Sequence, residues 1–333
     1  MNRAVTLAER PAGFPTEECF ALVESPVPEP GPGEVLVRVL WTSVDPYQRG
    51  RMSTRRSYAK SVEVGEVMTA QSAGAVVESN DPRFAPGDLV VGQLGWQEYS
   101  VARGRALRKV PEGVPLPMTL HVLGTNGLTA YFGLFDVARP RPGDTVVVSS
   151  AAGGVGQLVG QLAKIAGCRA VGIAGGPEKK GDLIEVYGYD AAIDYKGEDV
   201  RAALKEACPD GVDVYFDNVG GDLSGAVYPR LSRGARIAVC GQISQYNLEQ
   251  PQPTVHPGLL IVFRARMEGF LVTDYAARYD EAIPRLARWV AEGVLRHRED
   301  VTEGLENAPR AFIGMLRGEN RGKALVKVAD EPG

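Results

Sequence analysis

The sequence predicts an α/β protein in which an irregular β domain precedes a doubly wound parallel sheet. Up to about residue 120, Pro-Gly turns followed by β-branched runs recur, as at 30–39 and 85–92, without a long helical period. From about residue 124, six short apolar runs alternate with stretches of helical period, which is the pattern of a parallel sheet. These runs cover 145–150, 170–174, 191–194, 212–217, 235–240 and 268–272.

Composition excludes several classes of protein. The chain has 333 residues, 44% of them hydrophobic, which is enough for one or two cores. A net charge of −4 gives no basic footprint for nucleic acid or an anionic membrane. No apolar run reaches the ~18 residues of a membrane span, and residues 1–15 lack the apolar core of a secretory signal. The four cysteines are far apart in sequence, so we expect a cytoplasmic protein with reduced thiols.

The chain after the sixth run is predicted to hold two helices and a last strand. An amphipathic helix over 279–295 is followed by a short helix in 306–318 and the strand 323–328. From the residues alone, this strand could pair with either domain.

The stretch "SSAAGGVG" (149–156) nearly matches the dinucleotide fingerprint G-x-G-x-x-G, with Ala151 in place of the first glycine. It follows a strand and opens a helix, whose first N–H groups and partial positive charge can hold a pyrophosphate. Gly153 and Gly156 would let the backbone approach the phosphates. The alternative is a glycine-rich turn that binds nothing.

The residues after this loop favour NADP over NAD. A site for NAD usually has an acid about 20 residues on, at the end of the second strand. Residues 157–177 contain no Asp or Glu, and Lys179 and Lys180 follow. Small residues leave room for a 2′-phosphate and a lysine can neutralise it. Alternatively, these lysines belong to an ordinary solvated start of a helix.

Metal catalysis and acyl transfer are not expected. His121, His256 and His297 are isolated in the sequence, and neither a zinc-ligand pattern nor a G-x-S-x-G elbow occurs. A reductase can work without them, because the nicotinamide carries the hydride.

Eight ordered motifs resemble the zinc-free medium-chain dehydrogenase/reductases, most closely the branch of prostaglandin reductases, leukotriene B4 dehydrogenases and alkenal double-bond reductases. The motifs are "SVDPYQRGRM" (43–52), "GLTAYFGL" (127–134), "AAGGVGQLVGQLAKIAGC" (151–168), "YDAAIDYK" (189–196), "YFDNVGG" (215–221), "VCGQISQYN" (239–247), "RMEGFLV" (266–272) and "GENRGKALVKV" (318–328).

The resemblance implies a GroES-like β-barrel domain (1–122 and 296–333), which would include the last strand, and a Rossmann NADP-binding domain (123–295). It also implies an active site in the cleft and a homodimer. Zinc-dependent relatives carry a cysteine ligand near Ser43, Val44 and Asp45, so no metal is expected here. Gln48 departs from the family, which commonly has Met at this position.

The resemblance also assigns residues to the bound NADPH. The pyrophosphate would meet Gly153, Gly154, Val155 and Gly156; the 2′-phosphate would meet Lys179; and Tyr195 would bond a phosphate or ribose oxygen. Around the nicotinamide and its ribose it places Asn218, Cys240, Gly241, Ile243, Ser244, Tyr246, Phe270, Leu271, Val272 and Asn320. Alternatively, Tyr195 packs on the sheet, Asn218 caps the next helix, and 270–272 is plain buried strand.

The activity implied is reduction of the C=C bond of α,β-unsaturated ketones or aldehydes. A donor must then stabilise the charge that develops on the carbonyl oxygen, and Tyr246 and Tyr47 are the candidates. Arg49 and Arg51 are either solvated charges or contacts for an acidic substrate tail. The competing functions are a quinone oxidoreductase of the same superfamily and a non-catalytic NADPH-binding sensor.

Overall fold

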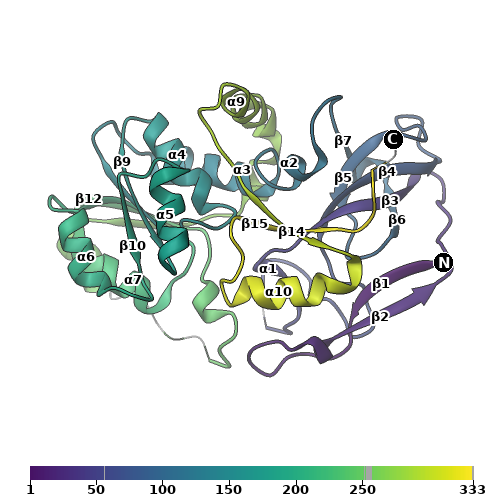
Figure 1. The fold of residues 1–333 in the computed structure, drawn as a ribbon, viewed down its shortest axis with the longest axis horizontal. Helices are drawn as coiled ribbons and strands as arrows, with labels where there is room; N and C mark the ends of the chain where they lie inside the picture. The colour runs from purple at the N-terminus through teal and green to yellow at the C-terminus, as the bar shows by residue number, and fades with distance from the viewer. Residues whose placement is uncertain (56, 251, 253–256, 332–333) are drawn as a thin grey trace. The chain divides into compact units, whose positions relative to one another are not determined.

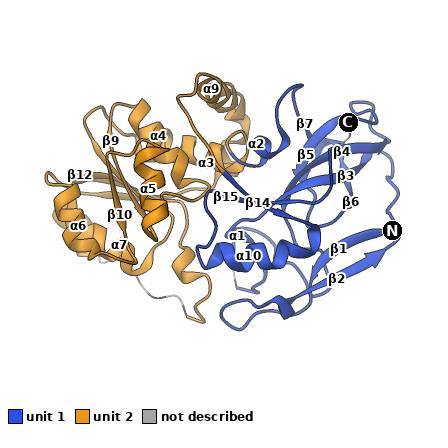
Figure 2. Cartoon of the chain, viewed as in Figure 1, with its two compact units in different colours: residues 1–121, 299–333 blue, residues 122–298 orange. Residues whose placement is uncertain are grey.

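The computed structural model describes residues 1–55, 57–250, 252 and 257–331, and it divides into two compact units. Unit 1 comprises residues 1–121 and 299–333, and unit 2 comprises residues 122–298 (Figure 2). The sequence placed these junctions at 122/123 and 295/296. Residues 296–298 stay with unit 2, where the buried amides of Gln157 and Gln161 bond the backbone of Arg298 and Arg296.

Unit 2 is built on a six-stranded sheet in which every neighbouring pair is parallel (Figure 1). The strand order β10-β9-β8-β11-β12-β13 is that of a doubly wound sheet, so the predicted Rossmann fold is confirmed. The strands are β8 (Thr145–Ser149), β9 (Arg169–Ala174), β10 (Ala191–Asp194), β11 (Val212–Asp217), β12 (Leu231–Val239) and β13 (Arg266–Gly269).

Helices cover both faces of this sheet. Side chains of α6 (Val200–Ala207), α7 (Gly221–Val227) and α8 (Pro257–Phe263) pack on one face with Val147, Val171 and Ile193. Strand residues that alternate with these point to the opposite face of the sheet, which is covered by α4 (Gly156–Ile165) and α5 (Pro177–Glu185). There Leu183 packs on Gly172. α3 (Thr125–Phe132) packs against α4 and against α9 (Tyr279–Ala291). Shorter turns of helix are η3 (Gly133–Ala138), η4 (Tyr228–Arg230), η5 (Ile243–Gln245) and η6 (Val272–Arg278).

Unit 1 contains a seven-stranded mixed sheet in the order β14-β15-β3-β4-β5-β7, with β6 also paired to β3. Its strands are β3 (Glu34–Ser43), β4 (Gln71–Ser79), β5 (Leu89–Gln93), β6 (Tyr99–Arg103), β7 (Arg108–Lys109), β14 (Glu299–Glu303) and β15 (Lys323–Lys327). A hairpin of β1 (Asn2–Leu7) and β2 (Phe20–Ser25) forms a second sheet. The helical elements are η1 (Glu17–Cys19), α1 (Tyr47–Arg51), η2 (Gly104–Ala106), α2 (Leu116–Leu120), η7 (Leu305–Asn307) and α10 (Ala308–Leu316).

The structure decides two points about the strands that the sequence left open or missed. The last strand, β15, pairs antiparallel with β3 and therefore belongs to unit 1. β14 pairs parallel with β15 but was not predicted, because its sequence, Glu299–Glu303, is mostly charged.

The predicted strand 268–272 was placed too late in the chain. β13 ends at Gly269, and Val272 already begins η6. The prediction extended the strand through 270–272 because these residues are apolar. Their side chains pack without belonging to the strand: the ring of Phe270 lies 6.2 Å from that of Phe216.

Candidate cofactor and active site

The glycine loop of unit 2 is closely packed where β8 turns into α4. Ser150 has a positive φ of 50°, and the N–H of Gly153 bonds the Ser150 carbonyl at 3.0 Å. A Cβ on Gly156 would lie 2.2 Å from the Ser150 carbonyl oxygen, and one on Gly153 would lie 3.0 Å from Ser150 Oγ. Only glycine at 156 therefore lets the helix start so close to the turn.

Ala151 occupies the first glycine position of the fingerprint without strain because the residue opposite has no side chain. Ala151 is fully buried and its N–H bonds the carbonyl of Ile173 at 3.0 Å. A Cβ on Gly172 of β9 would lie 2.9 Å from Ala151 Cβ. The missing glycine of the loop is thus matched by a glycine on the adjacent strand, which sequence reasoning did not find.

The N-terminus of α4 fits a phosphate. The N-cap residue of this ten-residue helix, Val155, makes no side-chain cap hydrogen bond, and its first turn contains no acidic residue. The hydroxyl of Tyr189, which is buried, donates to the carbonyl of Gly156 at 2.6 Å and holds the turn in place. A backbone cradle that a Cβ would fill, at the start of a helix, is what a dinucleotide pyrophosphate requires.

The adenosine end of the predicted site lies at the β9–α5 turn. Lys179 and Lys180 are half-buried in the first turns of α5. Lys180 forms an ion pair with Glu198 at 2.5 Å. Lys179, one residue before it, is the residue predicted to meet a 2′-phosphate. Tyr195 is 45% exposed, and its ring lies against Gly175, where a Cβ would come within 2.9 Å.

Sequence reasoning missed an acid at this turn, because it comes from the neighbouring strand. Asp194, at the end of β10, is buried and accepts the N–H of Gly176 at 2.6 Å and of Lys196 at 3.0 Å. The Gly176 hydrogen bond is the main cause that lowers the pKa of Asp194. The carboxylate is engaged by the backbone of the turn, and its charge stabilises that turn.

The carboxylate of Asp217, at the end of β11, organises the loops at the predicted nicotinamide end. It is 1% exposed. Its oxygens accept hydrogen bonds from the backbone of Val219 and Gly220 at 3.0 and 2.9 Å and from the Ser224 hydroxyl at 2.7 Å. The Tyr215 and Ser149 hydroxyls donate to it at 3.1 and 3.3 Å. A single buried acid thus joins β8, β11 and α7.

Asn218 fastens the end of β11 to the end of β8. Its backbone N–H donates to the Ser149 hydroxyl at 2.9 Å, and its side-chain amide donates to the Ser149 carbonyl at 2.7 Å. The alternative role of capping the next helix is not what this geometry shows, because the amide is turned toward β8 and α7 has Gly220 at its N-cap.

The segment from Cys240 to Tyr246 runs alongside these residues. The N–H groups of Cys240 and Gly241 bond the Asp217 carbonyl at 2.8 and 3.1 Å. The backbone of Ile243 and Ser244 bonds the carbonyls of Asn218 and Val219. Burial, and then the charge of Asp217, raises the pKa of the Cys240 thiol to about 12, so it stays protonated at neutral pH.

Tyr246 is the last residue of this segment, but its side-chain hydroxyl lies beside the first residues of the segment, Gly241 and Gln242. It accepts the backbone N–H of Gln242 at 3.2 Å. A Cβ on Gly241 would lie 3.2 Å from this hydroxyl and 3.4 Å from the carbonyl oxygen of Asn218. The structure therefore brings together Asn218, Gly241 and Tyr246. Phe270 packs at Gly133 and Phe216, and Leu271 and Val272 are half-buried beyond it.

Two predicted residues, Tyr47 and Asn320, belong to unit 1. Tyr47 begins α1, and its hydroxyl is buried. Burial and the Asp45 carboxylate raise the pKa of Tyr47 well above its ordinary value, which keeps the hydroxyl protonated. The amide of Asn320 donates to the Gly322 carbonyl at 2.6 Å, in the turn before β15.

Asp45, just before α1, forms a buried ion pair. Lys323 Nζ lies 2.6 Å from Asp45 Oδ1 and 2.7 Å from the Val44 carbonyl oxygen. Gln48, the departure from the family, is fully buried and accepts the Asp45 N–H at 2.8 Å while donating to the Thr69 carbonyl at 2.8 Å. The polar Gln48 is accommodated because both ends of its amide are bonded.

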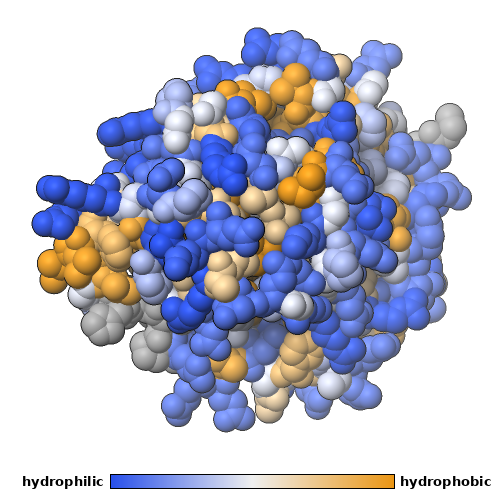
Figure 3. Space-filling view, turned by 60° about the vertical axis from the view of Figure 1, so that its left-hand side comes forward, coloured by the Kyte–Doolittle hydropathy of each residue, from blue (hydrophilic) through white to orange (hydrophobic). Residues whose placement is uncertain are grey.

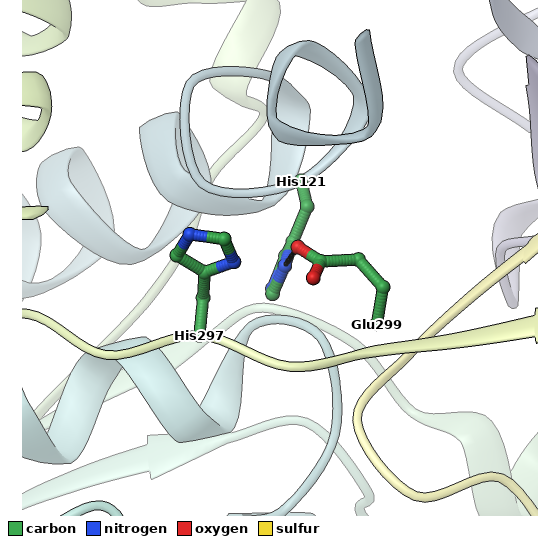
Figure 4. A group of neighbouring side chains, drawn as sticks. All are labelled: His121, His297 and Glu299. Carbon is green, nitrogen blue, oxygen red and sulfur yellow. Dashed lines mark hydrogen bonds and ion pairs between the residues drawn. The ribbon is translucent and has the colours of Figure 1, made fainter. Parts of the chain in front are cut away.

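His121, which the sequence shows as isolated, is paired in the structure. Its ring Nδ1 lies 2.8 Å from the carboxylate of Glu299, at the start of β14, and the ring is fully buried (Figure 4). His297 precedes Glu299 by two residues in the chain, and His256 lies outside the described residues. Among the helices that the structure describes, none combines the length and apolar character needed to cross a membrane.

Comparison with known proteins identifies the family. Residues 3–110 match the model described as the N-terminal domain of oxidoreductase, and residues 154–288 match the model described as zinc-binding dehydrogenase. The NADPH-dependent curcumin reductase of Escherichia coli is 44% identical, over 99% of this chain and 98% of its own. The NADP(+)-dependent 2-alkenal reductase of Nicotiana tabacum is also 44% identical, with the same two coverages.

A solved structure agrees with these relatives. The crystal structure of CurA from Vibrio vulnificus in complex with NADPH superposes with a TM-score of 0.95 at 43% identity, covering 99% of this chain and 100% of that one. The chain therefore belongs to the medium-chain dehydrogenase/reductases, in the zinc-free branch that contains the prostaglandin, curcumin and 2-alkenal reductases.

Proposed function

We propose that this protein, an NADP-dependent oxidoreductase, reduces the carbon–carbon double bond of α,β-unsaturated ketones and aldehydes. The observation that carries the proposal is the Tyr246 hydroxyl, placed at Gly241 and Gln242 beside the main chain of Asn218. The names of the relatives, a curcumin reductase and a 2-alkenal reductase, support the same chemistry.

The chain's own residues would hold NADPH in unit 2. The glycine loop, 153–156, would bind the pyrophosphate, Lys179 the 2′-phosphate and Tyr195 a phosphate or ribose oxygen. Asn218, the segment 240–246 and residues 270–272 would line the nicotinamide end, and Asn320 would complete it from the tail. When bound, NADPH supplies the hydride that adds to the β-carbon of the substrate.

The protein must stabilise the negative charge that develops on the substrate's carbonyl oxygen. Tyr246 would donate a hydrogen bond to that oxygen, since its own oxygen is already oriented by the Gln242 N–H. Tyr47 is the second candidate, because its raised pKa keeps a proton on the hydroxyl. The α-carbon would then take a proton from tyrosine or water.

The test measures NADPH oxidation with benzalacetone, with the saturated ketone benzylacetone and with a benzoquinone. We expect turnover with benzalacetone, formation of benzylacetone as the product, and none with the ketone that lacks the double bond. Tyr246→Phe should lower kcat with little change in NADPH affinity. Turnover of the quinone without the enone would instead assign a quinone oxidoreductase, and tight NADPH binding without turnover would assign a sensor.

We also propose that two copies associate. β13 lies at the edge of the six-stranded sheet, and α8 exposes Ile261 and Val262 by 77% and 58%. Figure 3 shows hydrophobic side chains gathered in patches on a surface that is otherwise mostly hydrophilic. Sedimentation equilibrium should give the mass of a homodimer, and a monomer mass at micromolar concentration would contradict the proposal.

A further inference from the structure

The side-chain carbonyl of Asn126, in the first turn of α3, is buried without a partner. The residue is 8% exposed, its Oδ1 is inaccessible to solvent, and no donor of the described residues reaches that oxygen at hydrogen-bond geometry. A buried amide oxygen normally accepts a hydrogen bond, because the water it loses on folding must be replaced. The unpartnered oxygen therefore points to a donor on a bound ligand.

Other buried amides of unit 2 are satisfied within the protein. The side chain of Gln157 donates to the Arg298 carbonyl at 3.3 Å and accepts its N–H at 2.9 Å. The side chain of Gln161 donates to the Arg296 carbonyl and accepts its N–H, both at 2.8 Å. These two amides have a partner at each end, so the orphaned oxygen of Asn126 is a departure from how this unit treats its buried amides.

Contacts at the other end of α3 show at which edge of the six-stranded sheet Asn126 lies. Tyr131 and Phe135 line a cavity together with Ile165 and Ala166, at the last turn of α4. α4 begins at the glycine loop, so its last turn lies toward the amino ends of the strands. α3 and η3 both pack against α4. Asn126, five residues before Tyr131, lies roughly 8 Å back along the helix axis, toward the carboxyl ends of the strands, where a doubly wound sheet binds its ligand.

The same segment lies over the half of the sheet assigned to the nicotinamide. η3, which continues α3, accepts hydrogen bonds from two strands. Arg236 Nε, on β12, donates to the Ala138 carbonyl at 3.2 Å. Arg266 Nη2, on β13, donates to the Val137 carbonyl at 2.5 Å. In the order of the sheet, β12 and β13 lie on the opposite side of β8 from β9, whose turn into α5 holds the predicted adenosine end. Asn126 therefore belongs to the nicotinamide half.

The chemistry of the missing partner selects the cofactor rather than the substrate. An amide oxygen can only accept a hydrogen bond. The enone or enal group of the proposed substrates offers a carbonyl oxygen, which is also only an acceptor. The nicotinamide ring, in contrast, carries a carboxamide whose NH2 group has two N–H donors.

We propose that Asn126 positions the nicotinamide of NADPH by accepting, at Oδ1, a hydrogen bond from the carboxamide N–H. The inference rests on the proposed cofactor site of unit 2 and adds to it a residue that the family resemblance does not assign. The bond supplies the partner that the buried oxygen lacks. It also fixes the carboxamide, and with it the orientation of the ring that carries the hydride.

The test compares NADPH with its reduced 3-acetylpyridine analogue, in which a methyl ketone replaces the carboxamide and the N–H donors are missing. Dissociation constants are measured from the quenching of protein fluorescence. Wild type should bind NADPH about tenfold more tightly than the analogue. Asn126→Leu, which keeps a side chain of similar size without an acceptor, should weaken NADPH binding about tenfold and bind the two nucleotides nearly equally.

The stability of the nucleotide-free protein distinguishes a positioning role from a structural one. Asn126→Leu should leave the urea midpoint unchanged or raise it, because the substitution removes a buried polar atom that has no partner. Asn2 of β1 is the matched control: its buried amide donates to the Tyr99 carbonyl at 3.1 Å and accepts the Tyr99 N–H at 2.9 Å. Asn2→Leu should lower the midpoint and retain the preference for NADPH.

Two kinds of failure are distinguishable. If wild type binds both nucleotides equally well, or if Asn126→Leu retains the preference for NADPH, the role of Asn126 is overturned and the cofactor site stands. A lower urea midpoint with an unchanged preference would likewise make Asn126 a structural residue. If wild type binds neither nucleotide, the proposed cofactor site itself fails. Should Asn126→Leu not fold, Asn126→Ala removes the same oxygen without filling the space, and the same loss of preference is expected.

Discussion

The ammonium group of Lys323, on β15, lies 2.6 Å from the carboxylate of Asp45, on the segment before α1, and both groups are buried. The pair joins two parts of unit 1 that are far apart in sequence. Burial lowers the pKa of Lys323, and the Asp45 charge opposes that effect. A pair of this kind holds its partners in one register, but either charge alone is costly to bury.

Lys323→Met should therefore destabilise the protein by about 3–5 kcal/mol, because it leaves the Asp45 carboxylate buried without a counter-charge. Urea-induced unfolding measures the effect, and Lys323→Met combined with Asp45→Asn should recover part of it. Lys327→Met is the matched control on the same strand, since its partner Asp330 is 91% exposed. Equal stability of wild type and Lys323→Met would contradict a structural role for the pair.

Gly156→Ala should disrupt the glycine loop, because the added Cβ would lie 2.2 Å from a backbone oxygen that cannot move alone. We expect a loss of stability of roughly 1–3 kcal/mol and NADPH binding weaker by about tenfold or more. Gly181→Ala, inside α5 and with open space at its Cβ, is the matched control and should be neutral or stabilising. Fluorescence titration with NADPH distinguishes the two; equal affinities would argue against the packing role of Gly156.

Asp217→Asn should weaken the loops at the predicted nicotinamide end. The substitution replaces one carboxylate oxygen by an NH2 group, which cannot accept the hydrogen bonds that the carboxylate accepts from these loops. The expected cost is about 1–3 kcal/mol in stability, together with lower NADPH affinity. Asp213, on the same strand, accepts the Thr145 N–H at 2.9 Å. Asp213→Asn removes the charge of this carboxylate and, as the matched control, should leave NADPH affinity unchanged. If both variants bind NADPH like the wild type, the Asp217 network does not position the site.

Lys179→Ala should weaken NADPH binding by about tenfold while leaving NADH binding nearly unchanged, because only NADPH has a 2′-phosphate. Binding of the two cofactors is measured side by side, and Lys205→Ala on α6 serves as the charge control. Equal loss for both cofactors would assign Lys179 a structural role.

The acid at the β9–α5 turn predicts a pH dependence. The pKa of Asp194 is lowered in the folded protein, from an ordinary value of 3.8, chiefly by the Gly176 N–H. A lowered pKa means that the ionised carboxylate stabilises the fold above pH 3.8, and that this contribution disappears as pH falls through the folded-state pKa.

Wild type should therefore be more stable than Asp194→Asn at neutral pH, and the difference should shrink only below about pH 4. Urea unfolding at a series of pH values measures it. A difference that is constant down to pH 2 would show that the turn does not depend on the charge of Asp194.

Much of unit 2 could be predicted from the sequence because its signals are local. Six apolar runs alternating with helical segments predicted the parallel sheet, and 191–194 and 212–217 coincide with β10 and β11. The glycine loop and the lysines beyond it predicted a dinucleotide site that favours NADP. Residues near each other in the chain carry these signals, and hydrophobic period and turn chemistry report them directly.

Tertiary structure decided the features that depend on residues far apart in the chain. The Asp45–Lys323 and His121–Glu299 pairs join residues that are far apart in the sequence, and no local sequence pattern predicts them. The match of Ala151 to Gly172 and the approach of Asp194 to Gly176 arise from the order of strands in the sheet. Sequence determined the fold class and the cofactor because backbone preference and hydrophobic period are local, whereas burial and charge pairing are properties of the folded chain.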